Sequence, residues 1–121
     1  MEISDSEFYK TAQISAPIVG STDKRIKKVI LFGSVFSSQA DSESDIDLGV
    51  VFPDSLKTKV AGEIINKCYE ALKSNKIPVG EIPGGVTLEP VSEGELIAGH
   101  KRGGVYGSIN EGQVLFERKA P

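Results

Sequence analysis

Blocks of apolar and polar positions along the chain predict a short series of strands. Residues 29–32 form a continuous apolar run that ends at a glycine, as expected of a buried strand. A second β-rich run covers residues 46–52 and ends at a proline. Residues 86–89 and 113–117 are predicted to be two further short strands, the last of them at an exposed edge of the sheet.

Helices are predicted where apolar residues recur about every four positions. The clearest helix follows Asp54 and Ser55, which are typical capping residues. Its apolar stripe consists of Leu56, Val60, Ile64, Cys68 and Leu72. Other helical segments are predicted at residues 4–19 (despite Pro17), 93–98 and 105–110, and the Gly- and Pro-rich segment 73–85 is predicted to be a loop. This order indicates an α/β or α+β fold, with helices packed against a small mixed sheet.

Length and composition agree with one globular unit. The 121 residues fit a single domain, residues 1–121, with one core. Cys68 is the only cysteine, so no internal disulfide can form, and we expect this thiol in the core. No apolar stretch approaches the roughly 20 residues that a membrane span needs. The first ten residues lack the pattern of a secretory signal, so we expect a cytoplasmic protein.

The charge balance narrows the class of partner. A formal net charge of −3 argues against general binding to nucleic acid, which depends on Lys and Arg contacts to phosphates. The strongest basic cluster, Lys24, Arg25, Lys27 and Lys28, is interpreted as a solvated helix end or strand lead-in. A metal-bound nucleotide or a basic partner is easier to accommodate than a nucleic acid.

The segment that carries chemistry is Gly33-Ser34, ten further residues, and then Asp45-Ile46-Asp47. Because strand side chains alternate between faces, Asp45 and Asp47 should share one face, about 7 Å apart along the chain. Two carboxylates on one face repel each other unless a cation offsets their charge. Mg²⁺ prefers oxygen ligands and leaves sites open for phosphate oxygens, so the pair is interpreted as a metal site.

Gly33 and Ser34 are interpreted as a phosphate-binding turn. Glycine lets a phosphate approach the main chain closely, and serine adds a hydroxyl and main-chain N–H donors. The chain contains neither a Walker sequence nor a Rossmann fingerprint. A calcium loop starting at Asp41 is rejected, because Ile46 stands where that loop requires glycine and Phe52 where it requires glutamate.

The spacing of Gly33-Ser34 and Asp45-Ile46-Asp47 between two apolar strands resembles the minimal nucleotidyltransferases of the DNA polymerase β superfamily. The end of the chain, with Val105-Tyr106 and residues 111–118, looks like the closing hairpin of that family. The resemblance is strongest over residues 25–118 and implies the polymerase β-type nucleotidyltransferase fold.

The resemblance also implies a site and a reaction. Asp45 and Asp47 would bind two Mg²⁺ ions, Gly33 and Ser34 would hold the β- and γ-phosphates of ATP, and an acceptor hydroxyl would attack the α-phosphorus. A third carboxylate normally completes the set, but Thr87 stands at its expected position. Glu89 shares the face of Thr87 and is a candidate third catalytic carboxylate; the alternative is an exposed polar strand residue.

A second departure concerns the loop of residues 35–40, which lacks the Arg and Gly that members of the family often carry. Triphosphate binding is then weaker, or a basic residue elsewhere compensates. The candidates are Lys24, Lys57, Lys101 and Arg102. His100, next to Lys101 and Arg102, could contact the substrate, but it is interpreted as an exposed residue without a catalytic role rather than as an acid or base.

Three functions follow from these patterns. The first is an adenylyltransferase that resembles the antitoxins of toxin–antitoxin pairs and modifies a tyrosine on a helical HEPN partner; a small-molecule acceptor such as an aminoglycoside is the alternative. The second is a catalytically impaired binding subunit of the same fold. The third is a structural or regulatory domain. Base preference, acceptor and oligomeric state are not encoded in recognisable motifs, although the last strand could pair across a homodimer.

Overall fold

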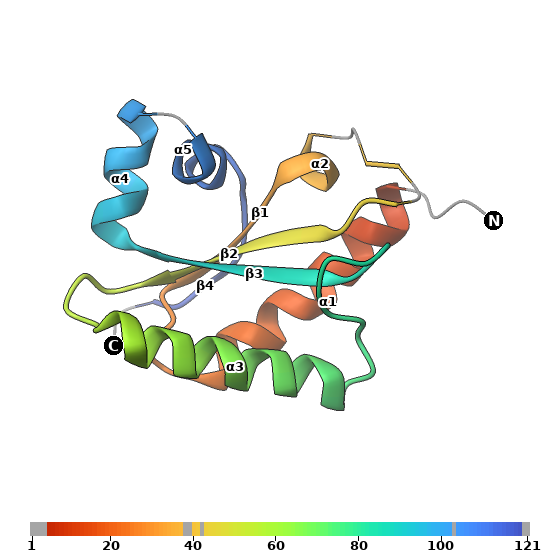
Figure 1. Cartoon of the computed structure of the whole chain (residues 1–121), viewed down its shortest axis with the longest axis horizontal. Helices are drawn as coiled ribbons and strands as arrows, with labels where there is room; N and C mark the ends of the chain where they lie inside the picture. The colour runs from red at the N-terminus through yellow and green to blue at the C-terminus, as the bar shows by residue number, and fades with distance from the viewer. Residues whose placement is uncertain (1–4, 38–39, 42, 103, 120–121) are drawn as a thin grey trace.

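The computed structural model describes residues 5–37, 40–41, 43–102 and 104–119, without the side chains of residues 5–6 and 100–106. Helices and strands alternate irregularly along the chain, as the apolar pattern predicted (Figure 1). Their bounds are α1 Asp5–Thr22, β1 Lys28–Phe32, α2 Gly33–Phe36, β2 Ile46–Phe52, α3 Thr58–Ser74, β3 Val86–Ser92, α4 Glu93–Arg102, α5 Gly104–Asn110 and β4 Gln113–Glu117.

A mixed sheet of four strands, in the order β3-β2-β1-β4, forms the centre of the molecule. β1 is antiparallel to β2 and to β4, whereas β2 and β3 are parallel. The predicted mixed α/β architecture is therefore confirmed, with β4 at an edge. No helix in the described part of the chain is both long enough and apolar enough to span a membrane.

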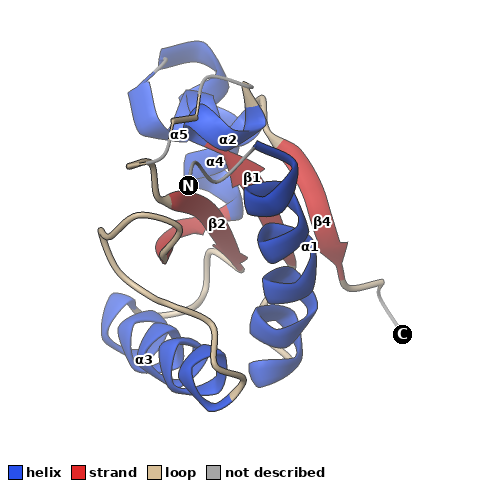
Figure 2. Cartoon of the chain, turned by 90° about the vertical axis from the view of Figure 1, so that its right-hand side faces the viewer, coloured by secondary structure: helices blue, strands red, loops and turns tan. Residues whose placement is uncertain are grey.

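The two faces of the sheet are covered differently. α1 and α3 pack on one face, where alternate strand residues such as Leu31, Leu48 and Val50 are buried in the main core (Figures 1 and 2). α4 and α5 lie over the other face, where Ile109 of α5 packs into a second, smaller core. An added Cβ at Gly49 would collide with Ile109, so a glycine allows α5 to approach β2 closely.

The main core follows the predicted stripe of α3. Ile64, Cys68 and Leu72 are buried, and the Cys68 thiol lies 3.8 Å from the Val19 carbonyl oxygen. Burial raises the pKa of this thiol to about 11, so the group is an un-ionised core residue, as predicted.

The start of α3 differs from the prediction. The chain turns at residues 53–56, where the Leu56 N–H donates to the Pro53 carbonyl, and α3 then begins at Thr58 without a side-chain cap. Asp54 instead accepts a 2.7 Å hydrogen bond from the Gly94 N–H in the first turn of α4. Asp54 therefore accepts a hydrogen bond at the start of a helix, as a capping residue does, but this helix is α4, forty positions further along the chain, and not α3.

The C-terminal segment also differs from the expected hairpin. Residues 104–110 form helix α5, and β4 pairs with β1, the first strand of the sheet. Arg118, just after β4, donates to the carbonyl oxygens of Ile26 and Gly20 at 3.1 and 2.6 Å. These bonds fasten the end of β4 to the last turn of α1 and to the segment between α1 and β1.

β3 is longer than predicted, because Pro90 does not end it. The Leu88 N–H points away from the sheet and donates to the Tyr69 hydroxyl at 2.9 Å. Two residues further on, the nitrogen of Pro90 faces the same outer side, where the missing N–H breaks no bond between strands. Tyr69 and Pro90 therefore leave the outer edge of β3 with fewer open donors for another strand.

Candidate active site

The turn between β1 and α2 depends on Gly33. This residue has φ of 79°, in the left-handed region that favours glycine. A Cβ at this position would also collide with the Asp47 carboxylate. Gly33 is therefore required both by its own backbone and by the carboxylate beside it, and it fixes where the chain turns from strand to helix.

Asp47 lies in β2 between two neighbouring strands, opposite Phe32 of β1 and opposite Thr87 of β3. Its neighbours Ile46 and Leu48 point into the main core and are completely buried. Asp45 precedes the strand and lines the same pocket as Asp47. The alternation of side chains therefore brings the two aspartates together on the face opposite the main core, as predicted.

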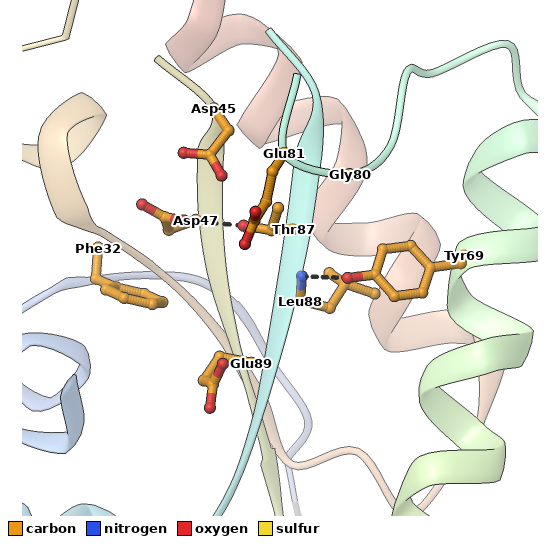
Figure 3. A pocket seen from close by; sticks show the side chains of 9 residues that line it. All are labelled: Phe32, Asp45, Asp47, Tyr69, Gly80, Glu81, Thr87, Leu88 and Glu89. Carbon is orange, nitrogen blue, oxygen red and sulfur yellow. Dashed lines mark hydrogen bonds between the residues drawn. The ribbon is translucent and has the colours of Figure 1, made fainter. Parts of the chain in front are cut away.

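This pocket has a volume of about 370 Å³ and lies where β2 and β3 begin (Figure 3). Its lining residues come from β1, β2, β3, α3 and the segments just before β2 and β3: Phe32, Asp45, Asp47, Tyr69, Gly80, Glu81, Thr87, Leu88 and Glu89. Four of these side chains are carboxylates, and no Lys, Arg or His is among the described residues that line it. The pocket is consequently suited to a cation with oxygen ligands.

Thr87 takes part in this site through Asp47. The Thr87 hydroxyl donates a 2.8 Å hydrogen bond to Asp47 Oδ1 across the parallel strand pair. Both side chains are partly buried. Thr87 therefore stands where the resemblance to the nucleotidyltransferases implies a carboxylate. Instead of a second negative charge it supplies a hydrogen-bond donor, which stabilises the ionised form of Asp47.

The pKa of Asp47 is nevertheless raised above its usual value of 3.8. Partial burial is the largest cause, and the charges of Asp45, Glu81 and Glu89 add to it, while the Thr87 hydrogen bond acts in the opposite direction. Negative charge at Asp47 is thus costly in this pocket, and a bound cation would remove much of that cost.

Glu89 shares the face of Asp47 and lines the pocket, but it lies further along the sheet. It is paired with Gly49, two residues beyond the pairing of Asp47 with Thr87, and its side chain is exposed. Figure 3 shows Glu89 at the opposite end of the pocket from Asp45. Among the described residues, no three acidic side chains form a group that could hold one metal ion. Asp45 and Asp47 therefore form a pair rather than a preformed triad.

Glu81 is a pocket residue that the sequence patterns did not single out. It lies in the loop before β3, next to Gly80, and its charge raises the pKa of Asp47 more than that of Glu89 does. A loop that contains Gly80, Gly84 and Gly85 just before a strand was the only available signal. The distance in sequence from Asp45 gave no reason to connect the two residues.

Ser34 follows Gly33 in the short helix α2 and is half-exposed. Its carbonyl accepts a 3.2 Å hydrogen bond from the Ser37 hydroxyl. Neither Gly33 nor Ser34 is among the described residues that line the pocket, although Phe32, the residue before them, is. If Gly33 and Ser34 bind phosphate, as predicted, they do so at the border of the pocket, next to Phe32.

Of the proposed basic substitutes, Lys24 and Lys57 are not among the described residues that line the pocket. Lys24 lines a separate hollow near the start of β1 and the end of β4, together with Lys27, Lys28, Arg118 and Lys119. Lys57 directly precedes α3. It follows the C-terminal end of β2, whereas Asp45 precedes the N-terminal end of that strand. The side chains of His100, Lys101 and Arg102 lie outside the described residues. The lysine-rich segment 24–28 is a turn that leads into β1, as predicted.

A family model described as polymerase beta, nucleotidyltransferase, matches residues 18–102, which is more than half of the chain and includes Gly33, Asp45, Asp47 and Glu81. The protein therefore belongs to the polymerase β nucleotidyltransferase family. No protein among the curated sequences matches the chain.

Proposed function

We propose that this protein transfers AMP from ATP to a hydroxyl group on a partner protein. The observation that carries the proposal is the pairing of Asp45 and Asp47 in a pocket whose described lining contains no basic residue, within a nucleotidyltransferase domain. The pocket opens at the surface, and its lining includes the exposed residues Glu81 and Glu89, which suits an acceptor carried by a protein.

The donor atoms of the pocket fit Mg²⁺. Asp45 and Asp47 offer hard oxygen ligands, and Mg²⁺ is commonly held by one or two carboxylates together with water and substrate phosphates. The raised pKa of Asp47 supports this assignment, because the described residues that line the pocket include four carboxylates and no basic side chain. Two bound Mg²⁺ ions would stabilise charge on the entering and departing oxygens.

The other residues of the site would orient the nucleotide. The main chain at Gly33 and the hydroxyl of Ser34 would bind the β- and γ-phosphates at the border of the pocket. The Thr87 hydroxyl would hold Asp47 in place and keep it ionised. In the transfer itself the acceptor oxygen bonds to the α-phosphorus, the bond from that phosphorus to the bridging oxygen breaks, and pyrophosphate leaves. A pocket carboxylate would accept the hydroxyl proton.

For the acceptor, we propose a tyrosine on a HEPN-type partner, so that the protein acts as the antitoxin of a pair. This proposal rests on the resemblance of the Gly33-Ser34 and Asp45-Ile46-Asp47 pattern to the minimal nucleotidyltransferases of such pairs.

A specific observation favours a second candidate, a catalytically impaired binding subunit of the same fold. Thr87 occupies the strand position opposite Asp47, and Glu89 is not grouped with the two aspartates. Such a subunit would retain nucleotide binding and contact with its partner but would not transfer AMP.

The test is a calorimetric titration of the protein with ATP, with and without Mg²⁺, followed by transfer of label from α-³²P-ATP to the partner. We expect Mg²⁺-dependent binding that is lost in the Asp45→Asn, Asp47→Asn double variant. A matched control, Glu63→Gln with Glu70→Gln, removes the same charge from exposed positions of α3 and should bind normally. Binding without transfer favours the impaired subunit, and no binding by the unmodified protein contradicts the nucleotidyltransferase proposal.

A further inference from the structure

The loop before β3 is fastened at both of its sides. Its backbone bonds to β3 through the Gly80 N–H, which donates to the Val86 carbonyl at 2.9 Å. On the other side, the Gly84 N–H donates to the Ser44 carbonyl at 2.9 Å, and the Ile46 N–H donates to the Gly85 carbonyl at 2.7 Å. Because Ser44 and Ile46 are the neighbours of Asp45 in sequence, these two hydrogen bonds fix the backbone of the loop next to Asp45.

The glycines of the loop determine how tightly it turns. Gly80 and Gly84 have φ of 100° and 73°, in the left-handed region. A Cβ at Gly85 would lie 2.5 Å from the Gly80 carbonyl oxygen, so the two ends of the loop are in close contact. Glu81 is the residue after Gly80, and this geometry places it in the wall of the pocket rather than in an extended surface loop.

Glu81 is the more suitable of the two additional carboxylates in the pocket. Its loop is hydrogen-bonded to the residues on both sides of Asp45, whereas Glu89 is paired with Gly49, two positions further along β3 than Thr87. Figure 3 shows Glu81 on the same side of the pocket as Asp45 and Thr87. The Glu81 side chain is exposed and has no hydrogen-bond or salt-bridge partner among the described residues, so rotation about its own bonds costs no existing contact.

We propose that Glu81 is the third metal-binding carboxylate of this protein, supplied by the loop before β3 in place of the strand position that Thr87 occupies. This inference rests on the proposed function. In this assignment Thr87 fixes Asp47 by a hydrogen bond, and Glu81 adds a third carboxylate from the loop before β3. Among the described residues the three carboxylates do not yet form a metal-holding group, so binding requires the side chain of Glu81 to turn toward Asp45 and Asp47 while hydrogen bonds hold the backbone of its loop.

The experiment measures Mg²⁺ binding rather than turnover. Mg²⁺ is titrated calorimetrically into the protein saturated with α,β-methylene-ATP, which cannot release pyrophosphate. The variants are Glu81→Gln, the matched control Glu89→Gln, and Glu81→Gln combined with Thr87→Asp. We expect Glu81→Gln to weaken Mg²⁺ binding by about tenfold or more, since the number of charged ligands strongly sets the affinity for hard cations. Glu89→Gln should change it by less than about threefold, because Glu89 lies at the opposite end of the pocket from Asp45 and would act only through its screened charge.

The double variant separates a ligand from a general charge effect. Thr87→Asp restores a carboxylate opposite Asp47, so it should return much of the Mg²⁺ affinity that Glu81→Gln removes. If the double variant has the melting temperature of the Glu81→Gln protein but does not regain Mg²⁺ affinity, the proposal is contradicted. It is also contradicted if Glu81→Gln and Glu89→Gln weaken Mg²⁺ binding equally. Unchanged binding by Glu81→Gln overturns the assignment of Glu81 alone if the Asp45→Asn, Asp47→Asn variant loses binding. If that variant also binds normally, the proposed function itself is wrong.

Discussion

Thr87 and Asp47 face each other across parallel strands and are joined by a 2.8 Å hydrogen bond from the threonine hydroxyl to the carboxylate. Asp47 is partly buried and lies among other carboxylates, so this donor offsets part of the cost of its charge. Thr87 therefore holds Asp47 in place by a hydrogen bond, whereas a carboxylate at position 87 would repel it.

Thr87→Val removes the donor while keeping the shape of the side chain. We expect the free energy of unfolding at pH 7 to fall by roughly 1–2 kcal/mol, because a partly buried charged acceptor loses its partner. Urea denaturation measures the change. Thr11→Val, which removes an exposed hydroxyl bonded to the Glu7 carbonyl within α1, is the control and should have little effect. Equal loss at the two positions would show that the bond to Asp47 has no special importance.

Asp47→Asn should stabilise the protein at neutral pH while abolishing Mg²⁺-dependent nucleotide binding. The folded-state pKa of Asp47 is raised, so its ionised form opposes folding above that pKa, and asparagine removes the charge. We expect a gain of roughly 0.5–1 kcal/mol at pH 7.

The gain from Asp47→Asn should depend on pH. It should shrink as the pH falls through the folded-state pKa toward 3.8, where the wild-type carboxyl also becomes neutral. Thermal unfolding at several pH values measures this difference. Glu89→Gln, which removes an exposed carboxylate of the same pocket, should give a smaller gain. Destabilisation by Asp47→Asn at pH 7 would contradict the electrostatic explanation.

Gly33→Ala should damage both folding and the site. The left-handed backbone costs a non-glycine residue about 1–2 kcal/mol, and the new methyl group meets the Asp47 carboxylate. We therefore expect a loss of about 2 kcal/mol or more, together with weaker nucleotide binding. Gly62→Ala is the matched control, because nothing lies within 4 Å of its added Cβ in helix α3, and it should stabilise by about 0.5–1 kcal/mol. Similar effects of the two substitutions would contradict the steric argument.

Acid should weaken the turn that precedes β1. Arg25 forms a 2.9 Å ion pair with Asp23, and its hydrogen bond lowers the pKa of Asp23 to about 2. A lowered carboxyl pKa stabilises the fold above the ordinary value of 3.8, and this contribution is lost as the pH falls toward 2. Asp23→Asn should therefore show a weaker dependence of stability on pH between about 4 and 2, which thermal unfolding in that range measures. An unchanged dependence would mean that other carboxylates control acid unfolding.

The strands of the fold could be predicted because their apolar residues alternate or cluster locally. Residues 46–52 were predicted with the bounds that β2 has. The prediction ended β3 at residue 89, and the outward orientation of Pro90 at the sheet edge explains how the strand continues to Ser92. The helix cap at Asp54 was misassigned because the local pattern cannot show that Gly94, far along the chain, competes for the same carboxylate.

The site was predictable where its residues lie close in sequence. Asp45 and Asp47 follow from the two-residue repeat of a strand, and Gly33 from the end of the preceding one. Glu81 could not be predicted, because its place depends on hydrogen bonds between its loop and the residues on both sides of Asp45.

The two faces of β2 have separate tasks. Ile46, Leu48 and Val50 belong to the main core, whereas Asp47 projects from the opposite face into the pocket. A substitution on the pocket face, such as a threonine in place of a carboxylate at position 87, changes the chemistry without requiring the main core to repack. Substitutions on the pocket face can therefore change the charge and the possible ligands of the pocket while the main core, and with it the fold, stays the same.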